Sequence, residues 1–261
     1  MSELMSVDYF GGRLSAIVRH NMVLLSRDPG QIFGYTVMPL LLMIALRPIY
    51  VARSDPVSGT TQATIGPMVL FSLITLNVIG HNLLHERTWH TWDRLRASPA
   101  TGAELLLGKS IPFYVMLLVQ QSIVVLCGVL TFGLRVPGQA AIMATVLMML
   151  VWSATILALG SLLATAVRSH GQLNTITDIG AFLVTVIGGG LTPPSAMPQW
   201  MHAIAPYSPG YWAISGYRAA LTGQAGGALL RSIAVLLLIA VAAAALATWL
   251  TGRRTGARGQ P

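Results

Sequence analysis

The chain has 261 residues, of which 54% are hydrophobic and 9% charged, and its formal net charge is +8. An ordinary soluble domain carries about 25% charged residues, so this composition excludes a soluble globular protein and favours one embedded in a membrane. The basic residues are spread over short segments between apolar stretches, which argues against nucleic-acid binding, and a single cysteine excludes a disulfide framework.

The N-terminal segment 9–28 precedes the first apolar stretch and is too polar to cross a bilayer. Arg13, His20 and Arg27 recur every seven residues, while the apolar side chains fall mostly on another face. This pattern predicts a helix that lies in the membrane interface. Its polar face is either solvated or in contact with a partner protein.

Six apolar stretches are long enough to cross a hydrocarbon core of about 30 Å, which takes about 20 helical residues. They lie at residues 31–51, 63–84, 111–134, 139–167, 171–191 and 226–250. Residues 54–62 are expected to form a turn-rich loop between the first two, and residues 135–138 a tight turn between the third and fourth.

Residues 192–223, before the last apolar stretch, contain five prolines among tryptophans and tyrosines. No straight helix tolerates that many prolines, and Trp and Tyr favour the membrane interface, so we expect a re-entrant or interfacial hairpin. The predicted fold class is therefore an all-α membrane protein, with six transmembrane helices, an N-terminal interfacial helix and this hairpin between spans five and six. The whole chain, 1–261, forms a single transmembrane domain.

The distribution of basic residues predicts the orientation. Six spans place both termini on one side, and Lys and Arg are enriched in cytoplasmic segments. With the termini in the cytoplasm, the inner segments hold eleven basic residues and the outer segments five: Arg47, Arg53, Arg135, Arg218 and Arg231. We therefore expect a multi-pass protein of the bacterial plasma membrane with both termini cytoplasmic.

Several apparent catalytic motifs fail on spacing. The segment 102–110 resembles a phosphate-binding loop, but five residues separate its glycines where four are needed, so no nucleotide site is expected. His85-Glu86 begins like a zinc-protease motif, yet Trp89 occupies the position of the second histidine. His81 and His85 share a helical face without a third ligand nearby, so polar residues at a helix end are the better interpretation than a metal site. No metal, cofactor or catalytic residue is predicted.

Polar side chains inside membrane spans are costly and often mark a transport pathway. The candidate pathway residues come from the second, third and fifth spans: Asn77, His81, Gln121, Asn174 and Asp178. Hydrogen bonding between helices is an equally good explanation for the amides. Asp178 is the strongest candidate, because it is a carboxylate about two turns into the bilayer, where we expect desolvation to raise its pKa.

The densest charge in the sequence lies at residues 85–104, between the second and third spans. Glu86, Asp93-Arg94-Leu95, Ser98-Pro99 and the segment 104–109 resemble the loop of ABC-2 type permeases, the membrane subunits of a class of ABC exporters. The resemblance extends to the early interfacial helix, the six spans and the hairpin at 192–223.

In that family the loop contains a short coupling helix that docks on an ATPase subunit. The resemblance places the following residues in or near that contact: Glu86, Arg87, Trp92, Asp93, Arg94, Leu95 and Pro99. It implies two copies of an ABC ATPase, which would hold the ATP and Mg²⁺, and a second permease chain, identical or paralogous. This chain itself would not be an enzyme.

The function that follows is the permease subunit of an ATP-driven exporter in the drug-resistance and lipid-export branch, embedded in membrane lipid. An amphipathic drug or antibiotic is the first expectation for the cargo. A glycolipid, lipid or polysaccharide precursor is the alternative. An intramembrane enzyme, or a structural or receptor-like membrane protein, is the more remote possibility.

Overall fold

The computed structural model describes residues 12, 15–25, 27, 29–53, 55–88, 102–167, 169–192, 197–224 and 226–256, and the regular structure among them is entirely helical. Residues 15–25 are helical, within the segment predicted as an interfacial helix. The elements that follow are α2 (Pro29–Arg53), α3 (Pro56–Thr88), α5 (Gly102–Phe132), α6 (Gly138–Ala166), α7 (His170–Ile187), α8 (Gln199–Ile204), η2 (Ala205–Tyr207), α9 (Pro209–Leu221) and α10 (Gly227–Gly256).

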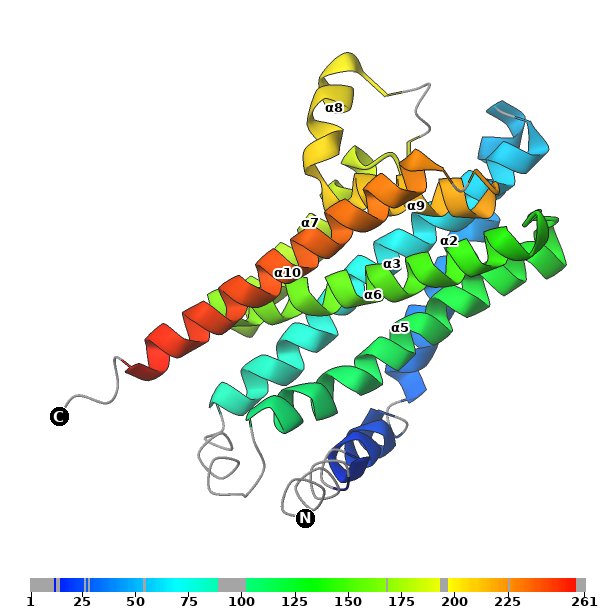
Figure 1. The fold of residues 1–261 in the computed structure, drawn as a ribbon. Helices are drawn as coiled ribbons and strands as arrows, with labels where there is room; N and C mark the ends of the chain where they lie inside the picture. Colours follow the sequence, from blue (N-terminus) through cyan, green and yellow to red (C-terminus); the bar gives the residue numbers. More distant parts are fainter. Residues whose placement is uncertain are drawn as a thin grey trace, which may run out of the picture.

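The long helices run alongside one another, with α8, η2 and α9 gathered at one end of the bundle (Figure 1). We call this the hairpin end; the turns that join α2 to α3 and α5 to α6 also lie there. At the opposite end, which we call the loop end, α3 finishes at Thr88 and α5 starts at Gly102. Helix α3 is the centre of the bundle: it packs against α2, α5, α6, α7 and α9, and every residue from 59 to 70 is buried.

Within the described part of the chain, five helical segments are long and apolar enough to cross a membrane: Phe33–Arg53, Pro56–His81, Ser110–Phe132, Gly138–Ala166 and Gly227–Leu250. They correspond to the predicted spans one, two, three, four and six. Helix α7 occupies the place of the fifth, but it has 18 residues, ends at Ile187 and is not in this set. The count of six spans therefore stays a prediction.

The loop predicted at residues 54–62 is wrong, because α3 already begins at Pro56. Proline is favoured in the first helical turn, and the Asp55 carboxylate caps it, accepting from the backbone N–H groups of Val57 at 3.0 Å and Ser58 at 3.1 Å. Hydrogen bonds from Ser58, through its side chain and backbone, and from Val57 lower the pKa of the Asp55 carboxyl. Gly59 does not mark a loop: a Cβ there would lie 2.8 Å from the backbone of Val51, so the glycine permits close approach of α2 and α3.

Glycines at residues 188–190 also shape the end of α7. The helix stops at Ile187, and Gly189 has a φ of +82°, a conformation that side chains with a Cβ rarely adopt. A Cβ on Gly188 would lie 2.7 Å from the backbone of Gly210 in α9. The triplet therefore ends the helix and lets the following hairpin pack closely against it.

The prediction that residues 192–223 do not form one straight helix is confirmed. They form α8, η2 and α9, with Pro209 in the first turn of α9. The turn after α7 is held by Gln62 of α3, whose Nε2 donates to the carbonyl oxygens of Gly189 at 2.6 Å and Gly190 at 2.9 Å. The Tyr50 hydroxyl of α2 donates to Leu191 O at 2.7 Å. The depth of this hairpin in a membrane stays a prediction.

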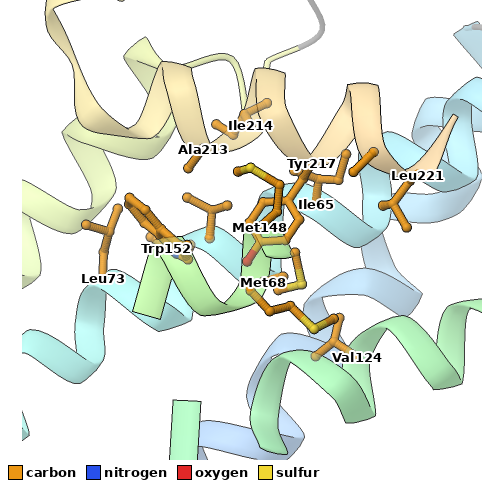
Figure 2. Close-up of a cluster of buried hydrophobic side chains, with 14 of the residues drawn as sticks. Ile65, Met68, Leu73, Val124, Met148, Trp152, Ala213, Ile214, Tyr217 and Leu221 are labelled. Atoms are coloured by element: carbon orange, nitrogen blue, oxygen red, sulfur yellow. The ribbon is translucent and has the colours of Figure 1, made fainter. Parts of the chain in front are cut away.

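The largest buried side chains pack where α3, α6 and α9 meet (Figure 2). Met148 of α6 lies beside Tyr217 of α9 and Met68 of α3, and Trp152 of α6 lies on the side of Leu73 of α3 and Ala213 of α9. This core excludes water from the centre of the bundle, so any polar group near it needs a partner within the protein.

Candidate functional site

Helices α3 and α7 face each other with polar side chains at helical spacing. On α3 these are Asn77 and His81, and on α7 they are His170, Asn174 and Asp178. Residues four apart lie along one face of a helix, so each set forms a polar stripe on its helix. The two stripes face each other, and we call these five residues the α3–α7 polar cluster.

The N-cap of α7 positions the polar stripe of this helix. Ser169 has an extended conformation, with φ −143° and ψ 157°, and its hydroxyl accepts from the backbone N–H of Gln172 at 3.2 Å. This is the N-cap arrangement that satisfies a donor of the first helical turn. His170 therefore occupies the first position of the helix and projects toward α3.

His81 contacts two other members of the cluster. Its Nε2 lies 2.5 Å from Asn174 Oδ1, and its Nδ1 lies 2.6 Å from Nδ1 of His170. The two imidazole rings are nearly parallel, at 4°, with centroids 4.7 Å apart. Because the amide oxygen of Asn174 can only accept, His81 donates through Nε2. In the neutral ring its Nδ1 then accepts from His170, so the contact holds a neutral pair or one positive charge, but not two.

Asp178 is less isolated than the sequence indicates. Asn77 Nδ2 donates to its Oδ1 at 3.5 Å, and Tyr35 of α2 lies within its electrostatic reach. The Asp178 side chain is nevertheless exposed, beside apolar residues such as Phe182 that are exposed on the same helix. If α7 is the fifth span, as predicted, a carboxylate there is costly against hydrocarbon, and this face then needs water or another protein surface against it.

Gln121 is not part of this cluster. It is fully buried, donates through Nε2 to Ser153 Oγ at 2.9 Å and Leu117 O at 3.0 Å, and accepts a hydrogen bond from the Tyr217 hydroxyl. The residue therefore ties α5 to α6 and α9, which agrees with hydrogen bonding between helices. The neighbouring Gln120 is also buried, and neither atom of its amide has a partner among the described residues.

The predicted ATPase-coupling residues lie at the loop end of the bundle or beyond the described residues. Glu86 and Arg87 belong to the last turn of α3, although their side chains fall outside the description. The others fall in residues 89–101, outside the described part: Trp92, Asp93, Arg94, Leu95 and Pro99.

Sequence reasoning missed one member of the α3–α7 polar cluster, and it missed the partner of Gln121, which lies outside the cluster. His170 falls between the predicted spans 139–167 and 171–191, although its spacing of four from Asn174 and eight from Asp178 is a usable signal. Tyr217, the partner of Gln121, comes from the hairpin, and no local pattern could pair residues 96 positions apart.

Comparisons with known proteins agree on one family. A family model described as "ABC-2 type transporter" matches residues 13–222. The chain is 27% identical over 159 residues to the linearmycin resistance permease protein LnrN of Bacillus subtilis, covering 61% of this chain and 40% of that protein. It is 24% identical over 150 residues to the protein named "Probable multidrug ABC transporter permease YbhR" of Escherichia coli, covering 56% and 37% respectively. The matched region thus spans about two fifths of the length of these curated relatives.

Proposed function

Because the chain belongs to the ABC-2 type transporter family, we propose that it is the permease subunit of an ATP-driven exporter that moves an amphipathic drug or antibiotic out across the bacterial plasma membrane. It is a multi-pass membrane transporter subunit, and subunits of this kind are not themselves catalytic. The family match over residues 13–222 carries the proposal. The resistance and multidrug names of two relatives support a drug as the cargo.

In this proposal, two copies of an ABC ATPase bind the loop end of the bundle, and both termini lie in the cytoplasm. A second permease chain, identical or paralogous, covers the exposed face of α7. Two observations support that pairing: Asn174 and Asp178 are exposed in the single chain, and the surface beside them is apolar. The cargo would then pass along the α3–α7 polar cluster, between the two permease chains.

The first prediction concerns the energy source. The segment 102–110 has the wrong glycine spacing for a phosphate-binding loop, and its residues 102–110 belong to helix α5 rather than to a loop after a strand. The purified chain alone should therefore neither bind nor hydrolyse ATP, whereas co-expression with its ATPase should give a stable complex that does. A labelled-nucleotide binding assay and a phosphate-release assay check both halves. Hydrolysis by the lone chain would end this proposal.

The second prediction concerns the cargo. Asp178→Asn keeps the size of the side chain and an oxygen that can accept from Asn77, but removes the negative charge. Hydrogen bonds to charged groups contribute roughly 1.5 to 3 kcal/mol, so export of a cationic amphipathic compound should fall about tenfold or more. Export of a neutral compound of matched shape should change little. Efflux of the pair is measured in cells that contain wild type or variant.

Subunit assembly is measured alongside efflux, with Thr175→Ser, on the same exposed helix, as the control variant. Equal loss of both compounds, or loss of assembly, would assign Asp178 a structural role. It would also remove the reason to prefer a cationic drug over a lipid or polysaccharide precursor as cargo.

A further inference from the structure

Arg218, on the last turn of α9, carries a half-buried guanidinium with few protein partners. Its Nη2 donates to Gln62 Oε1 at 2.6 Å, and within the described residues this is its one hydrogen-bond acceptor. A guanidinium has five N–H donors in a planar fork, so most of its hydrogen-bonding capacity is left for another ligand.

Gln62 holds this guanidinium in place without neutralising it. The Nε2 of Gln62 is committed to the carbonyl oxygens of Gly189 and Gly190, so its Oε1 must face Arg218. Gln62 itself is buried. The arginine is therefore positioned by an amide that is fixed at its other side, and its charge has no counter-ion in this contact.

Among the described residues, no carboxylate at the hairpin end is available to compensate Arg218. The sequence places five arginines there, at 47, 53, 135, 218 and 231, and the one acidic residue among the described residues of that end is Asp55, whose carboxylate caps α3. Arg47 differs from Arg218 because its guanidinium has more partners: it donates to Thr60 Oγ1 and to Phe132 O, and it lies over the Phe132 ring. Burial lowers the pKa of the Arg218 guanidinium, as expected for a cation without a counter-ion.

Aromatic side chains indicate the depth of this end in a bilayer. Trp200 is 60% exposed and Tyr207 89% exposed, on α8 and η2 beside α9. Tryptophan and tyrosine concentrate at the level of the lipid headgroups. Arg218 belongs to α9, which lies at the same end of the bundle as α8 and η2 (Figure 1). At the headgroup level of a bilayer, anionic lipids supply phosphate groups.

We propose that Arg218, positioned by Gln62, binds a phosphate oxyanion, and that the occupant is the headgroup phosphate of an anionic lipid in the leaflet at the hairpin end. The planar fork of arginine matches two phosphate oxygens, and the bound anion supplies the missing counter-charge. This proposal does not depend on the proposed export function. The protein could export its cargo without binding a lipid here, and it could bind a lipid here without being an exporter.

The experiment compares lipid retention by the full-length protein. Wild type, Arg218→Gln and the control Arg231→Gln are reconstituted in nanodiscs of phosphatidylglycerol and phosphatidylcholine, and native mass spectrometry gives the ratio of the two lipids retained. Arg231 is an exposed arginine of the same end on α10, so its variant removes an equal charge. We expect the Arg218→Gln variant to lose about tenfold in the preference for phosphatidylglycerol, and Arg231→Gln less than twofold. Equal effects of the two variants would reduce the proposal to diffuse attraction and overturn it.

A second variant and a competitor sharpen the test. Gln62→Glu places a carboxylate against the guanidinium and should abolish the preference with Arg218 still present; an unchanged preference would overturn the proposal. This variant also removes the donor to the carbonyl oxygens of Gly189 and Gly190, so its thermal unfolding is measured alongside. Inorganic phosphate added in excess distinguishes the source of the oxyanion. If inorganic phosphate displaces phosphatidylglycerol only at concentrations far above those of the lipid, the lipid is supported as the occupant. If phosphate displaces the lipid at equal concentrations, the proposal of a lipid occupant is overturned. If Arg218→Gln fails to fold, the test rests on the wild-type protein. A wild type that retains phosphatidylglycerol and phosphatidylcholine equally would overturn the proposal.

Discussion

Glu86→Ala and Arg94→Ala are each expected to lower transport by more than about tenfold while the permease still inserts and folds. Truncating one partner of a partly buried charge pair at an interface costs roughly 2 to 5 kcal/mol, so if these residues belong to the proposed ATPase contact, the loss is enough to weaken docking by more than about tenfold. Helix α3 supports this expectation mechanically: Glu86 belongs to its last turn, and the same helix runs through the centre of the bundle to the hairpin end. A displacement at the loop end can therefore reach the hairpin end as a rigid-body shift.

Two readouts separate uncoupling from misfolding. ATPase co-purification and cargo efflux should both fall in the two variants, while the amount of permease in the membrane stays at the wild-type level. Arg135→Ala is the matched control, because it removes an exposed arginine from the opposite end of the bundle. Full transport in both loop variants would place the ATPase contact on other residues. A loss as large in Arg135→Ala would show that net charge, and not the loop, is responsible.

The spans were predictable because crossing a bilayer requires about 20 apolar residues, and this length dominates the sequence of such a chain. The predicted stretch 139–167 and α6 (Gly138–Ala166) differ by one residue at each end. The start of α3 was not predictable on the same basis. The composition of this segment suggests a loop, because it contains Asp55, Pro56 and Gly59. In the structure Asp55 caps α3, Pro56 begins its first turn, and Gly59 permits the close contact with α2. Local composition does not reveal which of these roles a turn residue has.

The candidate site was predictable as a set of residues but not as an arrangement. Asn77, His81, Asn174 and Asp178 were identified because polar groups are costly in membrane spans. That α3 and α7 join them into one cluster, and that Gln121 lies elsewhere, depends on which helices pack together, and the sequence of one helix does not contain that information. The contact between His81 and His170 joins residues 89 positions apart. The pairing therefore required the structure.

Gly66→Ala is expected to destabilise the fold strongly, although alanine is the better helix former. A Cβ at position 66 would lie 2.1 Å from the carbonyl oxygen of Gly190, and this atom belongs to the backbone, so no rotation of a side chain can relieve the clash. The same oxygen accepts from Gln62 Nε2 at 2.9 Å, so moving it also strains the contact that holds the turn after α7. Overpacking of this kind costs typically about 1 to 3 kcal/mol and occasionally more, and we expect the upper part of that range.

Gly34→Ala is the matched control, because a Cβ at this helical position of α2 meets nothing within 4 Å. Replacing glycine by alanine inside a helix contributes about 0.5 to 1 kcal/mol through propensity, so this control should unfold at the wild-type temperature or slightly above. Thermal unfolding in a mild detergent measures both variants. If Gly66→Ala were as stable as Gly34→Ala, α3 and the turn after α7 would have to lie farther apart than this packing requires. The tie through Gln62 to the hairpin would then be lost as well, because the two contacts share the Gly190 carbonyl group.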